Sequence, residues 1–242
     1  AWQWKANGAG SSNTDGTITS TVSANTAAGF SIVRAASMAG SGGTIGHGLG
    51  TVPDMVIGRM QSETFNWQVW HQGLTNGTYS MHLNDTSAQA AVATVYTALP
   101  TSTLINTGAS WTNGNPAFFY VFTGVEGYSK FGKYNGNGST DGSFIYTGFK
   151  PAFVIFKRID SADNWAMYDA TRDSFNVAGK YLLSDTNAAE TTYSTAKVDF
   201  LSNGFKWRGA VNFGNASGGT YIYMAFAEHP FGGEDVAPAT AR

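Results

Sequence analysis

Aromatic side chains recur at equivalent places in the two halves of this chain, in a pattern suited to stacking on sugar rings. The first half holds Trp67-Gln-Val-Trp70-His, and the second holds Trp165-Ala-Met-Tyr168-Asp. Successive residues of a strand point to opposite faces, so Trp67 and Trp165 are expected in a core. Trp70 and Tyr168 then face either a second layer of the fold or a bound glycan.

Loops at strand ends carry function on a sandwich scaffold, so ligand contact is expected where these two strands end. The Gly-flanked pair Trp207-Arg208 adds an aromatic ring and a cation, which suit stacking and acidic sugars. The predicted binding residues are Trp70, His71, Tyr168, Asp169, Arg172, Trp207 and Arg208. In the competing interpretation, Trp70 and Tyr168 only pack one half of the chain against the other.

Signals for a metal site are weak. The chain has no cysteine, and the pair His71 and His82 has no clear carboxylate partner, so neither a metal nor a cofactor is predicted. Two similar loops at 12–16 and 138–142 hold oxygen ligands of the kind that calcium prefers. They are more typical of Asx-turns beside glycine.

Signals for catalysis are also weak. A glycosidase needs two carboxylates about 5–9.5 Å apart across one sugar bond. The aspartates of the second half lie mostly in predicted turns, where they are expected to accept hydrogen bonds from their own backbone. Glu126 and Glu228 end comparable strands, and Asp169 is the other candidate acid. We therefore predict a protein that binds without cleaving and is not an enzyme.

The composition favours a β-rich protein with little surface charge. Only 12% of the 242 residues are charged, 14% are aromatic and 30 are glycine, which indicates short strands joined by tight turns. The net charge of −2 provides no basic surface for nucleic acid, and no apolar stretch is long enough for membrane insertion. Residues 1–126 hold three basic and five acidic residues, whereas residues 127–242 hold eleven of each. A surface as poor in charge as that of the first half is often buried in an assembly.

The elements that must position these side chains are repeated along the chain. Gly29 and Pro53 return as Gly127 and Pro151, each 98 residues later, and the tryptophan motif returns at the same distance. The shift wanders further along, as insertions and deletions in loops produce. A period of about 100 residues is the size of one small domain, so the sequence predicts an internal duplication.

Each copy contains about seven strand candidates, bounded by clusters of Gly, Asn and Pro. Those of the first copy are 30–35, 43–48, 55–60, 67–72, 79–83, 103–107 and 117–125. Those of the second copy are 128–134, 143–147, 152–158, 165–169, 180–183, 199–207 and 220–227. Residues 17–22 are a candidate edge strand, and the Ala-rich stretch 87–97 is the one candidate for a short helix.

These elements predict an all-β fold of two tandem antiparallel β-sandwich repeats, jelly-roll-like and about 100 residues each. The alternative is one large concanavalin-like sandwich with one copy in each half. The expected organisation is a loop-rich N-terminal segment at 1–28, one repeat at 29–126, a second at 127–231 and a flexible tail at 232–242.

A string of longer motifs runs through the second half of the chain. They are Asn-Trp-x-x-Tyr-Asp at 164–169, Leu-x-Asp-Thr-x-Ala at 183–188, Phe-Leu-Ser-Asn-Gly-Phe at 200–205 and a Gly-Gly-Thr-Tyr segment at 218–228 that ends in Ala-Glu. Together they resemble a family of tailed-phage proteins common in marine phages, and the resemblance covers nearly the whole chain. It implies virion structural or tail-fibre components with concanavalin-like or SPRY-like β-sandwich modules. No catalytic or binding residue follows from it.

The resemblance implies a place on the exterior of the phage particle, among other virion proteins. The leading hypothesis is the C-terminal receptor-binding part of a tail fibre, which adheres to a host surface glycan or protein. One alternative is a decoration or appendage protein of capsid or tail with a role in assembly, and a third is a polysaccharide-degrading tailspike. Fibres are usually cyclic trimers, so a homo-oligomer, with a trimer as the first guess, is expected by analogy.

Overall fold

Short antiparallel strands make up both halves of the chain, so the predicted all-β class with β-sandwich character is confirmed. The computed structural model describes residues 3–192 and 194–228. The helices within these ranges are the 3-10 turn η1 (Thr26–Ala28) and the single-turn α1 (Asn212–Asn215). No helix in the described ranges has the length and apolar character needed to cross a membrane.

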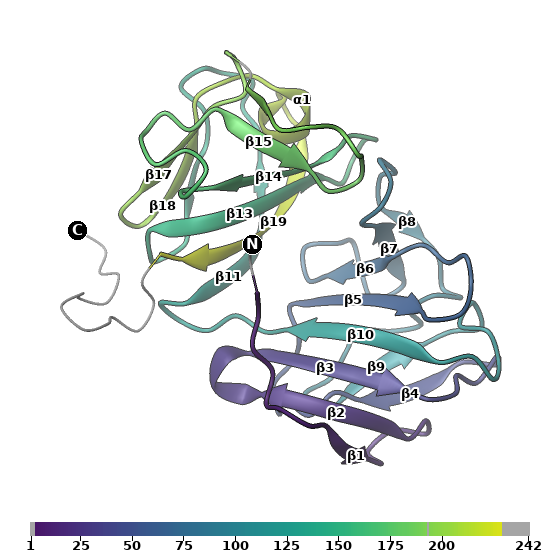
Figure 1. Cartoon of the computed structure of the whole chain (residues 1–242). Coiled ribbons are helices and arrows are strands. Elements are labelled where there is room, and N and C mark those ends of the chain that lie inside the picture. The colour runs from purple at the N-terminus through teal and green to yellow at the C-terminus, as the bar shows by residue number, and fades with distance from the viewer. Residues whose placement is uncertain (1–2, 193, 229–242) are drawn as a thin grey trace. The chain divides into compact units, whose positions relative to one another are not determined.

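The chain divides into two units (Figure 1). Unit 1 contains the residues up to Leu83 together with Gln89–Gly124, and unit 2 contains Asn84–Ala88 together with the residues from Val125 onward. The predicted N-terminal segment 1–28 is therefore part of unit 1. The predicted tail at 232–242 lies outside the described residues.

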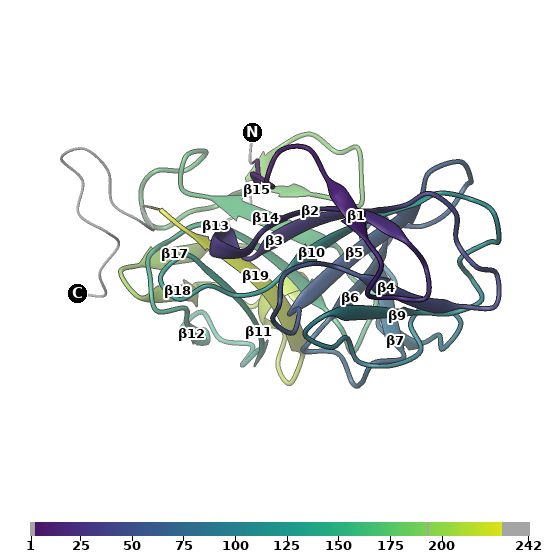
Figure 2. The ribbon, with the colours of Figure 1, turned by 90° about the horizontal axis from the view of Figure 1, so that it is seen from below.

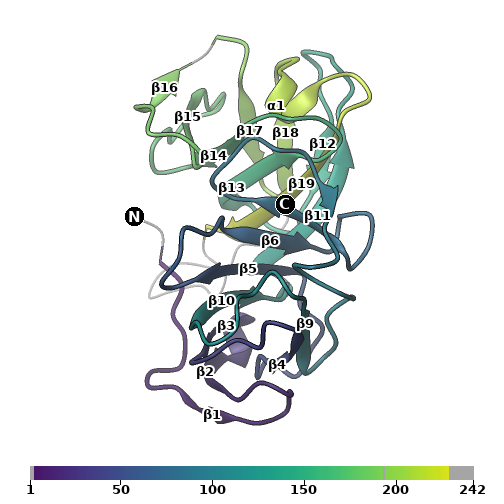
Figure 3. The ribbon, with the colours of Figure 1, turned by 90° about the vertical axis from the view of Figure 1, so that its right-hand side faces the viewer.

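Unit 1 is built on an eight-stranded antiparallel sheet in the order β1-β2-β3-β10-β5-β6-β7-β8, which Figure 1 shows in sequence. A two-stranded sheet, β4-β9, lies beside it (Figure 3). The strands are β1 (Ser11–Asn13), β2 (Ser20–Asn25), β3 (Phe30–Ala35), β4 (Gly43–Gly46), β5 (Met55–Met60), β6 (Gln68–His71), β7 (Tyr79–His82), β8 (Ala90–Ala91), β9 (Leu104–Thr107) and β10 (Ala117–Phe122).

Unit 2 has a six-stranded antiparallel sheet in the order β11-β19-β13-β14-β15-β16. Its second sheet is three-stranded, in the order β12-β18-β17, and these strands are labelled next to one another in Figure 2. The strands are β11 (Ser129–Asn135), β12 (Phe144–Tyr146), β13 (Pro151–Arg158), β14 (Trp165–Asp169), β15 (Lys180–Leu183), β16 (Thr191–Thr192), β17 (Val198–Leu201), β18 (Gly204–Trp207) and β19 (Thr220–Ala227).

The two long sheets share one strand order. The run β3-β10-β5-β6-β7-β8 of unit 1 corresponds, strand for strand along the chain, to β11-β19-β13-β14-β15-β16 of unit 2. The short sheets correspond as well, because Ile45 pairs with Ile105 in unit 1 and Ile145 pairs with Phe205 in unit 2. This shared order supports the predicted duplication.

Three local predictions need correction. The edge strand expected at 17–22 forms three residues later as β2, and β1 pairs outside it, so β2 is not the edge. The Ala-rich stretch 87–97 forms no helix, because Ala90 and Ala91 pair with β7 as β8. The single strand expected at 199–207 is the hairpin β17-β18, since a turn at Ser202-Asn203 reverses the chain.

The core of each unit lies between its long sheet and its short sheet. In unit 2 the core includes Val154 and Phe156 of β13 together with Phe205 and Trp207 of β18. In unit 1 the fully buried Trp111 ring packs on Phe119 of β10, with 4.8 Å between ring centroids. Its indole N–H donates to the Val95 carbonyl at 2.8 Å, so this buried polar group is satisfied.

The repeated tryptophans differ in burial. Trp165 is 1% exposed, as expected, whereas Trp67 is only half-buried. Replacing Trp165 with Ala is expected to lower the free energy of unfolding of unit 2 by about 3–5 kcal/mol, because removing a buried aromatic leaves a cavity. Trp67→Ala in unit 1 is expected to cost only about 1–2 kcal/mol, since part of the ring already faces water. Urea denaturation of both variants checks this order, and equal losses would contradict it.

Candidate functional site

Three of the predicted binding residues are core side chains. Trp70, Tyr168 and Trp207 are 3%, 0% and 0% exposed. Trp70 lies on the inner face of its sheet beside Tyr96 and Ile105, and the other two belong to the core of unit 2. The prediction that their rings are open to a glycan is wrong, because the short sheet of each unit covers this face.

Trp207 and Arg208 do not act as a pair. Trp207 is the last residue of β18 and Arg208 directly follows it, so their side chains point in opposite directions. The Trp207 indole donates to the Tyr134 hydroxyl at 2.9 Å inside the core. The Arg208 guanidinium lies outside, where it pairs with Asp199 and lies 3.6 Å from Asp141.

His71 and Asp169 both cap the turn that follows their strand. The His71 Nδ1 accepts from the Gly73 backbone N–H at 2.9 Å. An Asp169 carboxylate oxygen accepts from the Thr171 and Arg172 backbone N–H groups at 3.1 and 2.7 Å. Both side chains are buried, so the His-to-Asp exchange between the two halves preserves an acceptor for the turn rather than a catalytic base.

Arg172 completes an ion-paired cluster at the end of β14. Its Nε lies 3.0 Å from Asp169, and its Nη1 lies 2.8 Å from Glu190. The guanidinium is thereby already bound to two carboxylates, which leaves it poorly placed to bind an acidic ligand.

The candidate acids and metal loops have structural partners. Glu228 pairs with Lys150 at 2.8 Å, whereas Glu126 is exposed. In the first Asx loop, the Asp15 backbone N–H donates to Asn13, and in the second, the Ser139 N–H donates to Asn137. Among the described residues, no three His, Cys, Asp or Glu side chains are grouped to hold a metal ion.

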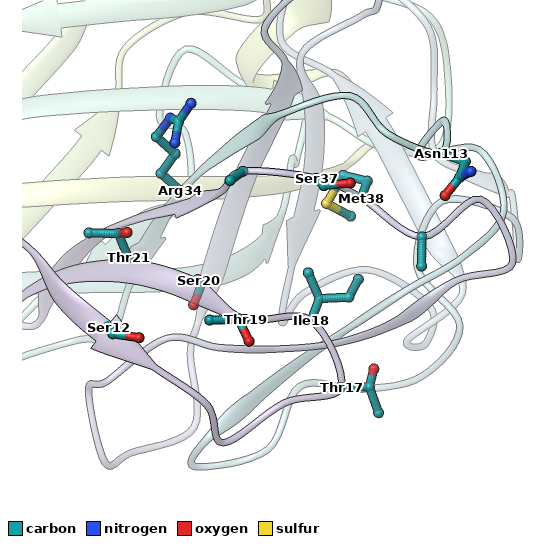
Figure 4. A pocket seen from close by; sticks show the side chains of 12 residues that line it. Ser12, Thr17, Ile18, Thr19, Ser20, Thr21, Arg34, Ser37, Met38 and Asn113 are labelled. Carbon is teal, nitrogen blue, oxygen red and sulfur yellow. The ribbon is translucent and has the colours of Figure 1, made fainter.

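A polar groove of about 500 Å³ opens on unit 1 (Figure 4). It is lined mainly by hydroxyl-bearing side chains and contains no carboxylate. In the view of Figure 4, Ser12, Thr21 and Arg34 lie toward one end of the groove and Asn113 toward the other. The lining residues are Ser12, Thr17, Ile18, Thr19, Ser20, Thr21, Arg34, Ala36, Ser37, Met38, Ala39 and Asn113.

Arg34 also begins a row of four side chains that crosses the outer face of the long sheet. Arg34 pairs with Phe118, Phe118 pairs with Arg59, and Trp67 directly precedes β6, the strand next to β5. The Arg34 guanidinium lies 5.8 Å from the Phe118 ring centroid, and that of Arg59 lies 5.2 Å from the Trp67 ring. We call these four residues the arginine row. Tyr120 stacks on Trp67 at 6.2 Å and extends its aromatic surface.

The corresponding row of unit 2 is largely buried. It reads Lys133, Ile222, Lys157 and Trp165, and the last three are buried. The Lys157 Nζ donates at 3.1 Å to the carbonyl oxygens of Thr86 and Arg158, which holds the segment Asn84–Ala88 within unit 2. Burial lowers the pKa of Lys157 to about 8, and nearby carboxylates oppose the shift only in part.

Unit 2 has its own hollow of about 600 Å³, lined largely by alanine and other apolar side chains between Asp163 and Phe213. Asp163 is the one carboxylate in its lining. A pair of carboxylates for sugar hydrolysis is therefore found in neither this hollow nor the groove of unit 1.

Sequence reasoning missed the arginine row. The usable signal was charge: Arg34 and Arg59 are two of the three basic residues among the first 126, and both lie in predicted strands. Arg34 and Arg59 flank Phe118 only because β10 lies between β3 and β5 in the sheet, and this strand order cannot be read from the sequence.

A family model matches nearly the whole chain. The model of a family described as "Domain of unknown function (DUF7483)" matches residues 1–230. No match was found among curated proteins or among solved structures.

The buried Lys157 predicts a pH dependence of stability. Its pKa is about 8 in the folded protein and 10.5 in the unfolded chain, so between these values the unfolded chain binds more protons. The free energy of unfolding is therefore expected to rise with pH from about 8 to about 9, by on the order of 1 kcal/mol. Urea denaturation of the protein across this range measures the slope.

The matched controls are Lys157→Met, which removes the buried titrating group, and Lys133→Met, which removes an exposed lysine from the same row. The first variant should lose the slope and the second should keep it. The range stops near pH 9 because burial raises the pKa of six tyrosines above the 10.0 of the unfolded chain, so that ionisation of tyrosines in the unfolded chain opposes the trend at higher pH. A slope that persists in Lys157→Met would contradict the assignment.

Proposed function

The chain belongs to the family described as domain of unknown function DUF7483, and we propose that it is a non-enzymatic structural protein of a phage particle that adheres to a host surface glycan. The virion part of this proposal is supported by the phage-like motifs of the second half. The adhesion part is supported by the geometry of unit 1.

The polar groove of unit 1 is the observation that carries the adhesion function. Its hydroxyl and amide groups are donors and acceptors of the kind that pair with sugar hydroxyls. At Arg34 the groove meets the arginine row, whose two half-buried rings add apolar surface for contact with the C–H side of a sugar. A polar groove joined to an aromatic surface is suited to holding an oligosaccharide.

Binding without cleavage is supported by the placement of the carboxylates. The groove has none, and Asp169 and Glu228 are held by Arg172 and Lys150. Hydrolysis of a glycoside requires an acid and a second carboxylate at the same sugar bond.

The receptor-binding end of a tail fibre is the placement that fits adhesion, with other virion proteins as partners and a trimer as the expected assembly. Labelling of intact particles with an antibody against this chain tests the placement. Label at the fibre tip is the expected result, and label over the head would instead assign the chain to decoration.

The protein is expected to retain host surface polysaccharide on a column without shortening it. Retention is measured with the immobilised protein, and chain length by size-exclusion chromatography before and after incubation. The double variant Thr19→Leu/Ser37→Leu replaces two groove hydroxyls with apolar side chains and should weaken retention about tenfold or more, since two or more hydrogen bonds are lost.

The matched control is Thr171→Leu/Ser174→Leu, which makes the same replacements at exposed positions of unit 2. Retention should be unchanged in this control. Shortened polysaccharide chains would contradict a purely adhesive role and support the tailspike alternative.

A further inference from the structure

We propose that the arginine row of unit 1 is a binding site for acidic glycans, in which Arg34 and Arg59 each bind a sugar carboxylate and Phe118 and Trp67 hold the sugar rings. This inference rests on the proposed adhesion function and adds the ligand class and the residues that select it.

Both guanidiniums are available for an anion. In the part of the chain that the structure describes, Arg34 and Arg59 form no ion pair and no hydrogen bond. The three described arginines of unit 2 are all paired with carboxylates: Arg158 with Asp160, Arg172 with Asp169 and Glu190, and Arg208 with Asp199. Unit 1 therefore keeps two cations without anions on one face.

The acids of unit 1 are engaged elsewhere. Glu63 accepts from Asn115 and Thr112, Asp54 from the Gly124 backbone, and Asp15 from Asn13. None of these carboxylates neutralises the arginine row, so its charge complements an anion supplied from outside.

Cation–π contact with the rings positions the guanidiniums for a planar anion. A guanidinium over an aromatic ring is held in place by the ring, while its N–H donors remain in its own plane and free to bond. Carboxylates are bound in this plane by two parallel hydrogen bonds. The alternation of arginine and aromatic residues thus provides, twice in succession, a fork for a carboxylate next to an apolar surface for a ring.

The spacing favours an oligosaccharide. Arg34 and Arg59 lie on strands two apart in the sheet, which places their backbones about 10 Å apart. That distance exceeds one sugar ring, so the two arginines would bind charges on different residues of a chain. The adjoining groove, reached at Arg34, then takes neighbouring sugar hydroxyls.

Nucleic acid is the less favoured anion. Binding to phosphate backbones relies on many neutralised charges, and the chain has a net charge of −2 with only three basic residues among the first 126. Two arginines and a hydroxyl-lined groove match an acidic sugar polymer better.

Equilibrium binding by calorimetry tests the site with four probes: oligogalacturonate, which carries carboxylates, dextran sulfate, neutral dextran and a double-stranded DNA oligonucleotide. The protein should bind oligogalacturonate, and its affinity should fall as salt concentration rises. Arg34→Gln and Arg59→Gln should each weaken binding about tenfold or more, because each removes a charge-assisted pair. Arg34→Lys should restore only part of the affinity, since it keeps the charge but not the planar fork.

Lys133→Gln is the control, because it removes one exposed positive charge from the corresponding row of unit 2. It should leave binding unchanged, and equal melting temperatures would show that all variants fold. The inference would be overturned if neutral dextran bound as tightly as oligogalacturonate, or if the protein preferred dextran sulfate or DNA. It would also be overturned if oligogalacturonate still bound to the double variant Arg34→Gln/Arg59→Gln. If the double variant still retained host polysaccharide, the adhesion function would be supported and only the acidic-glycan site would be refuted. If no protein, wild type included, retained host polysaccharide, both the adhesion function and the acidic-glycan site would be refuted.

Discussion

Packing of a short sheet onto one face of a long sheet is the interaction on which each unit depends. It sets which side of every strand is core and which is surface. Phe156 and Trp207 meet across this interface in unit 2, with 5.0 Å between their ring centroids, and Trp70 lies at the equivalent layer of unit 1. Once this face is covered, the side chains at alternate positions must face outward or be covered by something else.

The outer face of the long sheet is covered in unit 2 and partly exposed in unit 1. In unit 2, Lys157 bonds to the Thr86 carbonyl, and the row around it is buried. In unit 1, Arg59 stands 98 residues before Lys157, is itself partly exposed and places its guanidinium over the Trp67 ring. One strand order thus supports a covered row in one unit and an open, cationic and aromatic row in the other.

Charge pairing follows the same division. The carboxylates near the ends of the unit 2 strands are bound to arginines, lysines or backbone N–H groups, as Asp169 and Glu228 illustrate. These acids stabilise turns and strand ends, which is the ordinary use of Asp beside a turn. In unit 1 the few acids are satisfied locally, and the two arginines of the sheet have no carboxylate partner among the described residues.

The sequence by itself determined several of the strands. The segments at 30–35, 55–60, 165–169, 180–183 and 220–227 were located to the residue, because strand composition and turn residues are local properties. Only the tertiary structure decided which face of each strand is buried. The side chains of Trp67 and Trp70 lie on opposite faces of the long sheet, and the alternation of residues does not show which face the short sheet covers. The candidate site was missed for the same reason, since Arg34, Phe118 and Arg59 come together only when β10 inserts between β3 and β5, a pairing between segments distant in the sequence.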